Sequence, residues 1–464
     1  MRPFLSPVDE RSPLDMTRFI LAMRRSGRST LHEAKHFPPP FFVAPRESRH
    51  IRGGKTITFL DVLAGRRFRD GILRVESNPD IKGVATSDAA KAGFIPLHWE
   101  KVLQVTIPYA ALIPTGSENV IVAGKAYSAT HDALSTARMQ RDLCVMGLVA
   151  GEALRLARDR GVTLRDVPVD RLQQRLIAQG VLRPEDLADD DMGFGRSPAA
   201  IAAEVAAASD MDACLAASAQ LCLLPRDEVC ALLEPHAGPD RHAVNRVLGF
   251  LGRRRGTDHL VALVQQALAE PELSTKLFGG DGNKLSMPDQ GYAPWTALRL
   301  QCLANAGDTR AVPLLAALAA KINLQVEAMH SSWGYLFSLA CGFERLATPV
   351  GREPLRRVLD APLFRNRLVR RTSDLRACRD TMSERLAYLR LTLARALTRC
   401  GDVQGALALC EFLDEARVCY ARAARSELVA ATQKDYGFRA QAWREWLDQP
   451  GLVLPTNPLT LRFG

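Results

Sequence analysis

The chain has 464 residues, is 47% hydrophobic and 24% charged, and carries a formal net charge of +10 at pH 7. This ordinary composition can bury a sizeable core, and the length favours about three domains. The sequence holds no run of 18 apolar residues and begins without a signal-peptide core. We therefore expect a soluble, cytoplasmic protein rather than a membrane protein.

Neither the positive charge nor the cysteines indicate a special class of partner. The basic runs Arg253–Arg255 and Arg365–Arg371 lack the interleaved aromatic residues of a stacking surface. We expect them to be solvated helix faces and expect no nucleic-acid partner. The ten cysteines are scattered without a C-x-x-C pair, so neither a disulfide framework nor a metal cluster is indicated.

Residues 1–40 are predicted to be a proline-rich lead with a short amphipathic helix at Met16–Arg25. The lead spells H-E-x-x-H from His32 to His36. In that pattern two histidines one helical turn apart bind zinc, and the glutamate activates a water. Here the three prolines Pro38–Pro40 end any helix almost at once, and no third ligand follows at a recognisable spacing. We therefore predict that this motif binds no metal.

Residues 41–185 are predicted to form an α+β domain. Alternating apolar residues predict a strand at Lys55–Leu60, and a second strand is expected at Gln104–Ile107. Further along, the apolar run Val120–Ala123 lies between turn-forming residues and predicts a short buried strand.

A long helix is expected after a polar loop, from near Ala137 to Arg160, with Gly161 as its C-terminal cap. Gly147 and Gly151 stand four residues apart, so they share one helix face with Ala150 beside them. Each mid-helix glycine costs roughly 1 kcal/mol relative to alanine. Such glycines suit a close approach by a packed backbone or by a flat ligand, and both alternatives remain open.

The residues from the apolar run into the helix also follow one recognisable motif. The motif consists of Ala123, Gly124, Lys125, Ser128, His131, Arg138, Gly147, Ala150 and Gly151. It resembles the C-terminal flavin-binding segment of the FAD-dependent oxidoreductases related to fumarate reductase and the glucose-inhibited division flavoproteins. Lys125 replaces the arginine of that family, which keeps the charge but loses the bidentate fork. Ser135 stands where a glycine is usual.

The resemblance implies FAD as the cofactor, with the helix N-terminus directed at the flavin ring. Arg138 is implied to stabilise anionic reduced flavin, and His131 to act as a proton donor or substrate ligand. Arg46 and Arg49 resemble the family's arginine-rich segment. They either clamp an anionic substrate or phosphate group, or form surface ion pairs. The implied cofactor-binding residues are Ala123, Gly124, Lys125, Ser128, Arg138, Gly147, Ala150 and Gly151.

A flavoenzyme of this kind also needs a strand, a G-x-G-x-x-G loop and a helix to hold the pyrophosphate. The sequence from Gly193 to Pro198 matches that pattern only in part, and Ser197-Pro198 instead predicts the start of a helix. We therefore expect the chain to be the C-terminal portion of a longer or split flavoenzyme, with a separate Rossmann half as a candidate partner.

An acidic linker at Asp186–Asp191 is predicted to end this portion. Residues 195–446 are expected to be all-helical, followed by a tail at 447–464. The helix–turn–helix pattern at Trp295–Leu315, with an approximate copy at Leu391–Leu413, resembles a HEAT-type repeat, while irregular helical packing is the alternative.

The expected fold is thus an α+β flavoprotein portion without its Rossmann half, followed by an all-α domain of HEAT-like repeats. The expected function is FAD-dependent oxidation or reduction of a substrate that the sequence does not identify. The alternative is a non-catalytic scaffold that binds a protein partner through the helical repeats and keeps a relic flavoprotein segment.

Overall fold

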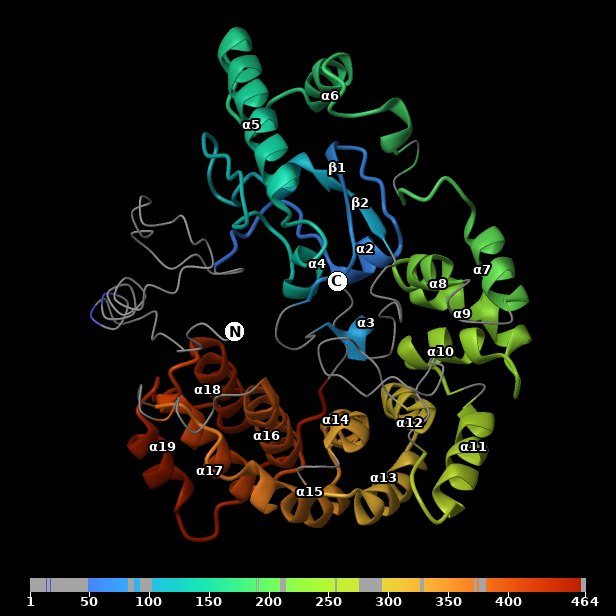
Figure 1. Cartoon of the computed structure of the whole chain (residues 1–464), viewed down its shortest axis with the longest axis vertical. Helices are drawn as coiled ribbons and strands as arrows, with labels where there is room; N and C mark the ends of the chain where they lie inside the picture. Colours follow the sequence, from blue (N-terminus) through green and yellow to red (C-terminus); the bar gives the residue numbers. More distant parts are fainter. Residues whose placement is uncertain are drawn as a thin grey trace, which may run out of the picture. The chain divides into compact units, whose positions relative to one another are not determined.

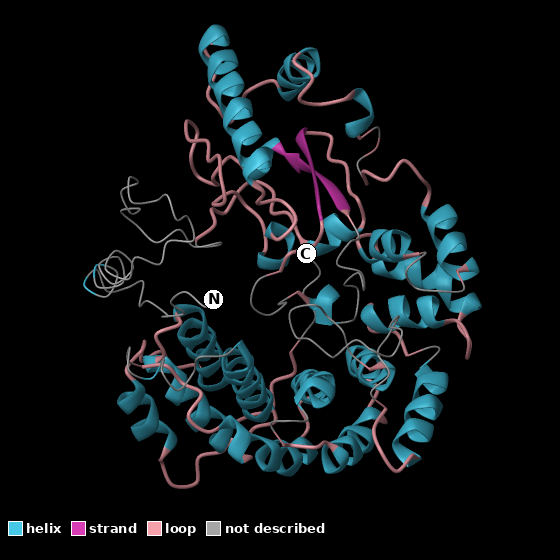
Figure 2. Cartoon of the chain, viewed as in Figure 1, coloured by secondary structure: helices cyan, strands magenta, loops and turns pink. Residues whose placement is uncertain are grey.

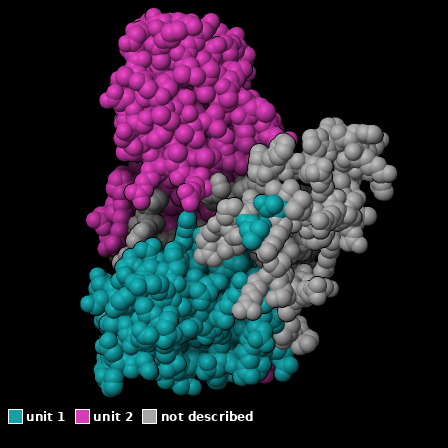
Figure 3. All heavy atoms as spheres, turned by 90° about the vertical axis from the view of Figure 1, so that its left-hand side faces the viewer, with its two compact units in different colours: residues 1–45, 309–460 teal, residues 46–308, 461–464 magenta. Residues whose placement is uncertain are grey.

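The computed structural model describes residues 49–81, 87–91, 102–188, 190, 192–208, 214–254, 257–274, 294–325, 329–370, 374 and 381–459, together with Leu14 and Thr17. This part of the chain is mostly helical and contains a two-stranded sheet (Figures 1 and 2). The H-E-x-x-H motif and Arg46 lie outside the described residues. The chain divides into two compact units (Figure 3). In the described part, residues 49–308 form the unit that comes first in the sequence, here called the first unit and labelled unit 2 in Figure 3. Residues 309–459, with Leu14 and Thr17, form the second unit, labelled unit 1 in Figure 3.

The first unit contains the two-stranded sheet, and its helices come before, between and after the two strands in the sequence. Its elements are α2 (Phe59–Leu63), β1 (Gly71–Ser77), α3 (Asp88–Lys91), β2 (Leu103–Pro108), α4 (His131–Leu134), α5 (Gln140–Arg160), α6 (Val169–Ala178), α7 (Pro198–Ala207), α8 (Leu215–Cys222), α9 (Arg226–Leu233), α10 (His242–Phe250), α11 (Thr257–Ala269) and α12 (Trp295–Asn305).

Strands β1 and β2 pair antiparallel, with Val75 opposite Val105 and Leu73 opposite Ile107. These apolar residues are buried, while α5 and α6 pack against β1. The strand expected at Gln104–Ile107 is therefore confirmed. The strand expected at Lys55–Leu60 is wrong, because Thr58 and Asp61 form a capping box that starts helix α2 within it.

Helix α5 confirms the long helix that the sequence predicted. It begins at Gln140 and ends at Gly161, which adopts the left-handed conformation with φ +64°. The buried strand expected at Val120–Ala123 is wrong. This segment forms no strand among the described residues, and the Val120 side chain is 47% exposed. An apolar run becomes a strand only where a neighbouring strand pairs with it.

The second unit is all-helical in its described part. Helix α16 packs against α14, α15, α17 and α18, so it forms the centre of the unit. At its core Arg395 forms ion pairs with the buried Glu344 and with Glu427. The elements are α13 (Ala311–Lys321), α14 (Met329–Leu346), α15 (Arg352–Leu359), α16 (Thr381–Arg399), α17 (Val403–Glu411), α18 (Val418–Thr432) and α19 (Ala440–Leu447).

The two expected helix–turn–helix patterns correspond to α12 with α13 and to α16 with α17. Asp402 caps α17 by accepting a hydrogen bond from the Gln404 N–H. Asp308 does not cap α13 in the same way, because its carboxylate accepts from the Thr257 hydroxyl at 2.8 Å. The division between the compact units also falls directly after Asp308. No repeat is identified in the helices that the structure describes.

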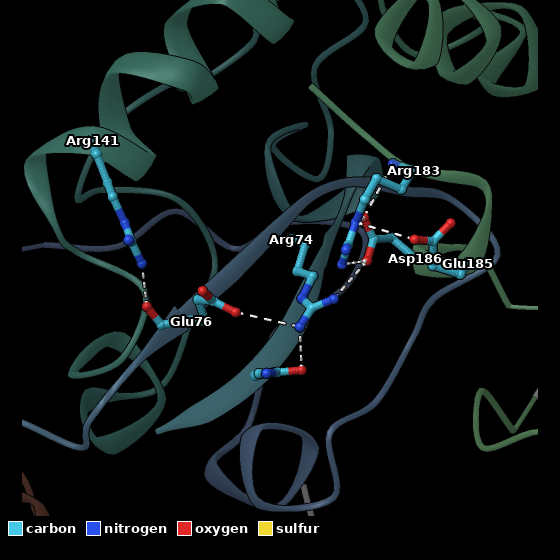
Figure 4. Close-up of polar contacts among 7 residues, drawn as sticks. Arg74, Glu76, Arg141, Arg183, Glu185 and Asp186 are labelled. Atoms are coloured by element: carbon cyan, nitrogen blue, oxygen red, sulfur yellow. Dashed lines mark hydrogen bonds and ion pairs between the residues drawn. The ribbon is translucent and has the colours of Figure 1, made fainter. Parts of the chain in front are cut away.

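The acidic segment expected to be a linker is held to the first unit (Figure 4). Asp186 is buried and accepts hydrogen bonds from Arg74 of β1 at 3.1 Å and from Arg183 at 3.0 Å. Burial by itself would raise the pKa of Asp186, but these hydrogen bonds outweigh it and lower that pKa. The domain boundary that the sequence analysis places between residues 185 and 195 remains a prediction.

Candidate functional site

The loop at residues 124–131 lies directly against the segment at residues 50–58. The Ile51 N–H donates to the Ala126 carbonyl at 2.9 Å, and the Ile57 N–H donates to the Ser128 carbonyl at 3.1 Å. The Thr130 N–H returns a bond to the Ile57 carbonyl at 2.9 Å. The structure thus brings the loop that carries Gly124, Ser128 and His131 against the segment that directly follows Arg49.

Gly53 allows this close approach of backbones. A Cβ atom at this position would lie 2.8 Å from the Ser128 Cβ and 2.9 Å from the Ala110 carbonyl oxygen. Any side chain larger than hydrogen would therefore push the two segments apart. Ser128 is buried, and its hydroxyl lies 2.8 Å from the Thr56 hydroxyl. The expected cofactor ligand Ser128 therefore also holds the loop in place.

His50 belongs to the site, although the sequence patterns did not select it. Its Nδ1 lies 2.9 Å from the Tyr127 carbonyl oxygen. A carbonyl can only accept, so Nδ1 carries a proton and donates this hydrogen bond. In the sequence, only its position directly after Arg49 indicated that His50 belongs to the site. Arg49 itself is exposed.

His131 begins helix α4, and its side chain is 28% exposed. Its Nε2 lies 3.9 Å from the carboxylate of Asp132, which is fully buried and accepts a hydrogen bond from the Ser87 N–H at 2.7 Å. Lys125 is exposed in the loop before it, as is Ala123, while Gly124 is half-buried. His131 and Lys125 are thus the side chains of this loop that are both ionisable and accessible to solvent.

The Arg138 side chain is bound by another residue of this chain, Asp80. Its guanidinium donates to the Asp80 carbonyl at 2.7 Å and to the Asp80 carboxylate at 3.0 Å, and its side chain is only 8% exposed. The sequence did not predict this pairing, because 58 residues separate the two. A role in stabilising reduced flavin remains a prediction, and the structure adds a role in closing the fold.

The first turn of α5 contains a buried carboxylate that the sequence reasoning missed. Asp142 is 5% exposed and accepts from the Arg141 Nε at 3.1 Å, and its Oδ2 has no hydrogen-bond partner within the described chain. Burial raises the pKa of Asp142, and the Arg141 charge opposes that rise. Burial, and next the Asp142 charge, raise the pKa of the enclosed Tyr127 phenol. The signal in the sequence was an acidic residue beside a helix start.

Arg141 also fixes the start of α5 to the sheet. Its guanidinium donates to the Glu76 carbonyl at the end of β1 (Figure 4). The Tyr127 hydroxyl donates to the Ala137 carbonyl at 3.3 Å, which connects the loop to the residues just before α5. The loop, the end of the sheet and the helix start therefore form one connected region.

The helix glycines do not contact this region. A Cβ at Gly147 or at Gly151 would meet no atom within 4 Å, and both residues are exposed. Ala150, which lies beside them on α5, is buried. No residue that the structure describes therefore makes the expected close approach at the two glycines.

Comparison with known protein families identifies this part of the chain. Residues 33–176 match the family described as FAD dependent oxidoreductase. This region is an FAD-dependent oxidoreductase domain. The match covers the 50–58 segment, the 124–131 loop and α5, and a largely helical region follows it. No curated protein and no solved structure was found to match.

The described residues show neither a metal site nor a membrane-spanning helix. Among these residues, no group of three or more histidine, cysteine, aspartate or glutamate side chains could hold a metal ion. In the same described residues, no helix is long and apolar enough to cross a membrane.

Proposed function

We propose that the oxidoreductase domain supplies the ring-facing side of an FAD site, and that a polypeptide segment outside these 464 residues supplies the phosphate-binding side. The observation that carries this proposal is the hydrogen-bonded contact between residues 50–58 and 124–131, beside the start of α5. Bound FAD would supply the ability to accept and return a hydride. The substrate class stays open.

The residues present fit the ring end of the cofactor. Gly124 has φ +111°, and a Cβ there would meet nothing within 4 Å, so its backbone is open to a flat ligand. The N–H groups of Gln140 and Arg141 in the first turn of α5 make no hydrogen bond within the described chain. Such helix-terminal donors favour an anionic or carbonyl group. His131 and Lys125 are ionisable side chains of the loop, and His50 contacts that loop at the Tyr127 carbonyl.

The residues present do not fit the pyrophosphate end. The 464 residues contain no G-x-G-x-x-G. The nearest match, at Gly193 and Gly195, is a left-handed turn whose N–H groups already donate to the Asp190 carboxylate. Burial would raise the pKa of Asp190, but the hydrogen bonds from Gly193 and Gly195 prevail and lower it. This turn thus binds an internal carboxylate in place of a phosphate.

The second candidate is the interaction scaffold built on HEAT-like repeats, with a protein partner on the helical region. It is supported by the helix–turn–helix element at α16–α17, with the left-handed Gly401 at the turn. The flavin proposal is preferred because the family match falls on the site-bearing segment.

Hydrogen–deuterium exchange tests the flavin proposal on the full chain. Riboflavin carries the ring without the pyrophosphate, so at about 1 mM it should occupy even a weak ring site. We expect slower exchange in residues 50–58, in residues 124–131 and in the first turn of α5. Unchanged exchange in all three segments would show that this region does not face the flavin ring.

A further inference from the structure

Helices α10 and α12 pack against each other and begin at the same end (Figure 1). The rings of His242, the first residue of α10, and Trp295, the first residue of α12, have centroids 5.3 Å apart. Seven residues further along each helix, a Cβ at Gly249 would lie 2.9 Å from the Cys302 Cβ. Because both contacts have the same offset, the two helices run in the same direction. Their N-termini, which are the positive ends of two helix dipoles, therefore lie together.

The start of α10 has no side-chain cap. Its N-cap residue, Arg241, makes no capping hydrogen bond through its side chain. The N–H groups of His242 and Ala243, in the first turn, donate to no residue that the structure describes. Such N–H groups suit an anion. By itself this is an ordinary helix start, and the side chains around it are what distinguish the site.

Arg299 carries a charge that no described residue neutralises. Long side chains on a helix point toward its N-terminus, and the Arg299 guanidinium lies over the Trp295 ring, 5.4 Å from the ring centroid. It forms no hydrogen bond or ion pair with any residue that the structure describes, and its Nε is buried without an acceptor. Burial lowers the pKa of Arg299, and the nearby Cys302 thiol opposes that shift only in part. The guanidinium is thus desolvated without a carboxylate to compensate for it.

The surroundings of Arg299 are positive as well. Burial, and next the Arg299 charge, lower the pKa of His242, while the exposed Asp240 opposes that shift. Arg246, one turn after His242 on α10, is buried, and burial lowers its pKa to about 10. Positive groups that have lost their water are stabilised by a bound anion. The shared end of α10 and α12 therefore favours a negatively charged ligand.

We propose that Arg299, His242 and the first turn of α10 bind the phosphate group of a small phosphorylated ligand. A guanidinium donates paired hydrogen bonds to phosphate oxygens, and the N–H groups at a helix start bind the remaining oxygens. A phosphate group carries nearly two negative charges, which matches a guanidinium beside two helix ends better than the single charge of a carboxylate. The site lies beyond residues 33–176 of the family match, so it does not depend on the proposed function.

The experiment uses the full chain, with inorganic phosphate as the probe and acetate as the carboxylate probe. Both are titrated at about pH 7.5, with sodium chloride holding the ionic strength constant. Tryptophan fluorescence, to which Trp295 contributes, measures binding, and thermal melts measure the stabilisation that accompanies it.

Two variants change the site, and one serves as the control. R299M keeps an apolar side chain over Trp295 without the charge. H242F keeps the ring contact with Trp295 without the imidazole N–H. The control is R171M, because Arg171 is a 55% exposed residue of α6 and loses the same charge.

For the wild-type chain and R171M we expect a phosphate Kd of about 1 mM and a Tm that rises by about 3 °C in about 20 mM phosphate. R299M should weaken phosphate binding at least about 10-fold and lose that rise, and H242F should weaken binding at least about 3-fold. In buffer without phosphate, R299M should melt no lower than the wild-type chain, because the charge that it removes has no partner among the described residues.

Several results would overturn the phosphate site. Phosphate affinities that agree between the wild-type chain, R299M and H242F would do so, as would the absence of both a fluorescence change and a rise in Tm. A rise in Tm that R299M shares with the wild-type chain would reflect the general stabilising effect of phosphate salts and would count against the site. Acetate that binds as tightly as phosphate, with the same dependence on Arg299, would overturn the phosphate group as the ligand and assign a carboxylate instead.

Discussion

Gly193 and Arg67 meet backbone to backbone. The Arg67 N–H donates to the Gly193 carbonyl at 3.1 Å, and a Cβ at Gly193 would lie 1.9 Å from the Arg67 carbonyl oxygen. Together with Asp186 on Arg74, this contact fastens the chain that follows α6 to the sheet-bearing part of the first unit. Gly193 belongs to the partial match to a phosphate-binding loop, and in the structure it is needed for this packing contact.

Gly193→Ala should therefore be severely destabilising. The residue combines φ +79° with a clash against rigid backbone, so we expect a loss of about 3 kcal/mol or more in the free energy of unfolding. Gly195→Ala is the matched control, because it has φ +65° but meets only the mobile end of the Arg67 side chain. Urea denaturation followed by circular dichroism would measure both. Equal losses for the two variants would refute the backbone clash.

Gly147→Ala and Gly151→Ala should act in the opposite direction. Each adds a methyl group in open space on an exposed helix face. We expect each to stabilise the isolated chain by about 1 kcal/mol, and the pair to be roughly additive. Thermal and urea unfolding would test this. Destabilisation by either change would mean that part of this chain already packs against Gly147 or Gly151.

Arg138→Gln should weaken the fold whether or not flavin is present. The change removes the ion pair between Arg138, which is 8% exposed, and the 15% exposed Asp80 carboxylate. We expect a loss of about 2–4 kcal/mol in the free energy of unfolding. Arg158→Gln is the control, since Arg158 is 78% exposed at the other end of α5 and should change stability by less than about 0.5 kcal/mol. If both variants prove equally stable, Arg138 is available for a purely functional role.

Asp186→Asn should remove a pH-dependent contribution to stability. The folded state lowers the pKa of this carboxyl, so its contribution is complete above the ordinary aspartate pKa of about 3.9 and is lost as the pH falls through the lower folded value. At pH 7 we expect the variant to lose about 2 kcal/mol. Urea titrations at several pH values should show wild type and variant converging below about pH 4. Asp170→Asn, at an exposed position, should show no such convergence, and a gap independent of pH would contradict the account.

Local sequence patterns predicted helices such as α5 and α7, because their apolar spacing and their capping residues lie within one segment. Helix α5 was predicted because its buried positions recur at helical spacing and Gly161 ends it. Ser197 and Pro198 start α7 as expected, with the Ser197 hydroxyl accepting from the Ala200 N–H. A helix makes its hydrogen bonds within one segment, so its sequence carries most of the information.

Features that depend on distant partners were not predictable in this way. The run Val120–Ala123 has the composition of a strand but finds only one partner bond in the described chain. The pairing of Arg138 with Asp80, and of Arg74 with Asp186, joins residues 58 and 112 positions apart. For the candidate site, the family resemblance indicated which segments meet. It did not indicate His50, or that Gly147 and Gly151 of α5 would meet no residue that the structure describes.

The most direct test of the central claim compares the affinities of the full chain for FAD and for riboflavin. A chain that provides only the ring-facing side gains nothing from the pyrophosphate and adenosine. Calorimetry should therefore give dissociation constants that agree within about 3-fold. A preference for FAD of about 100-fold or more would show that these 464 residues bind the pyrophosphate, and would contradict the account.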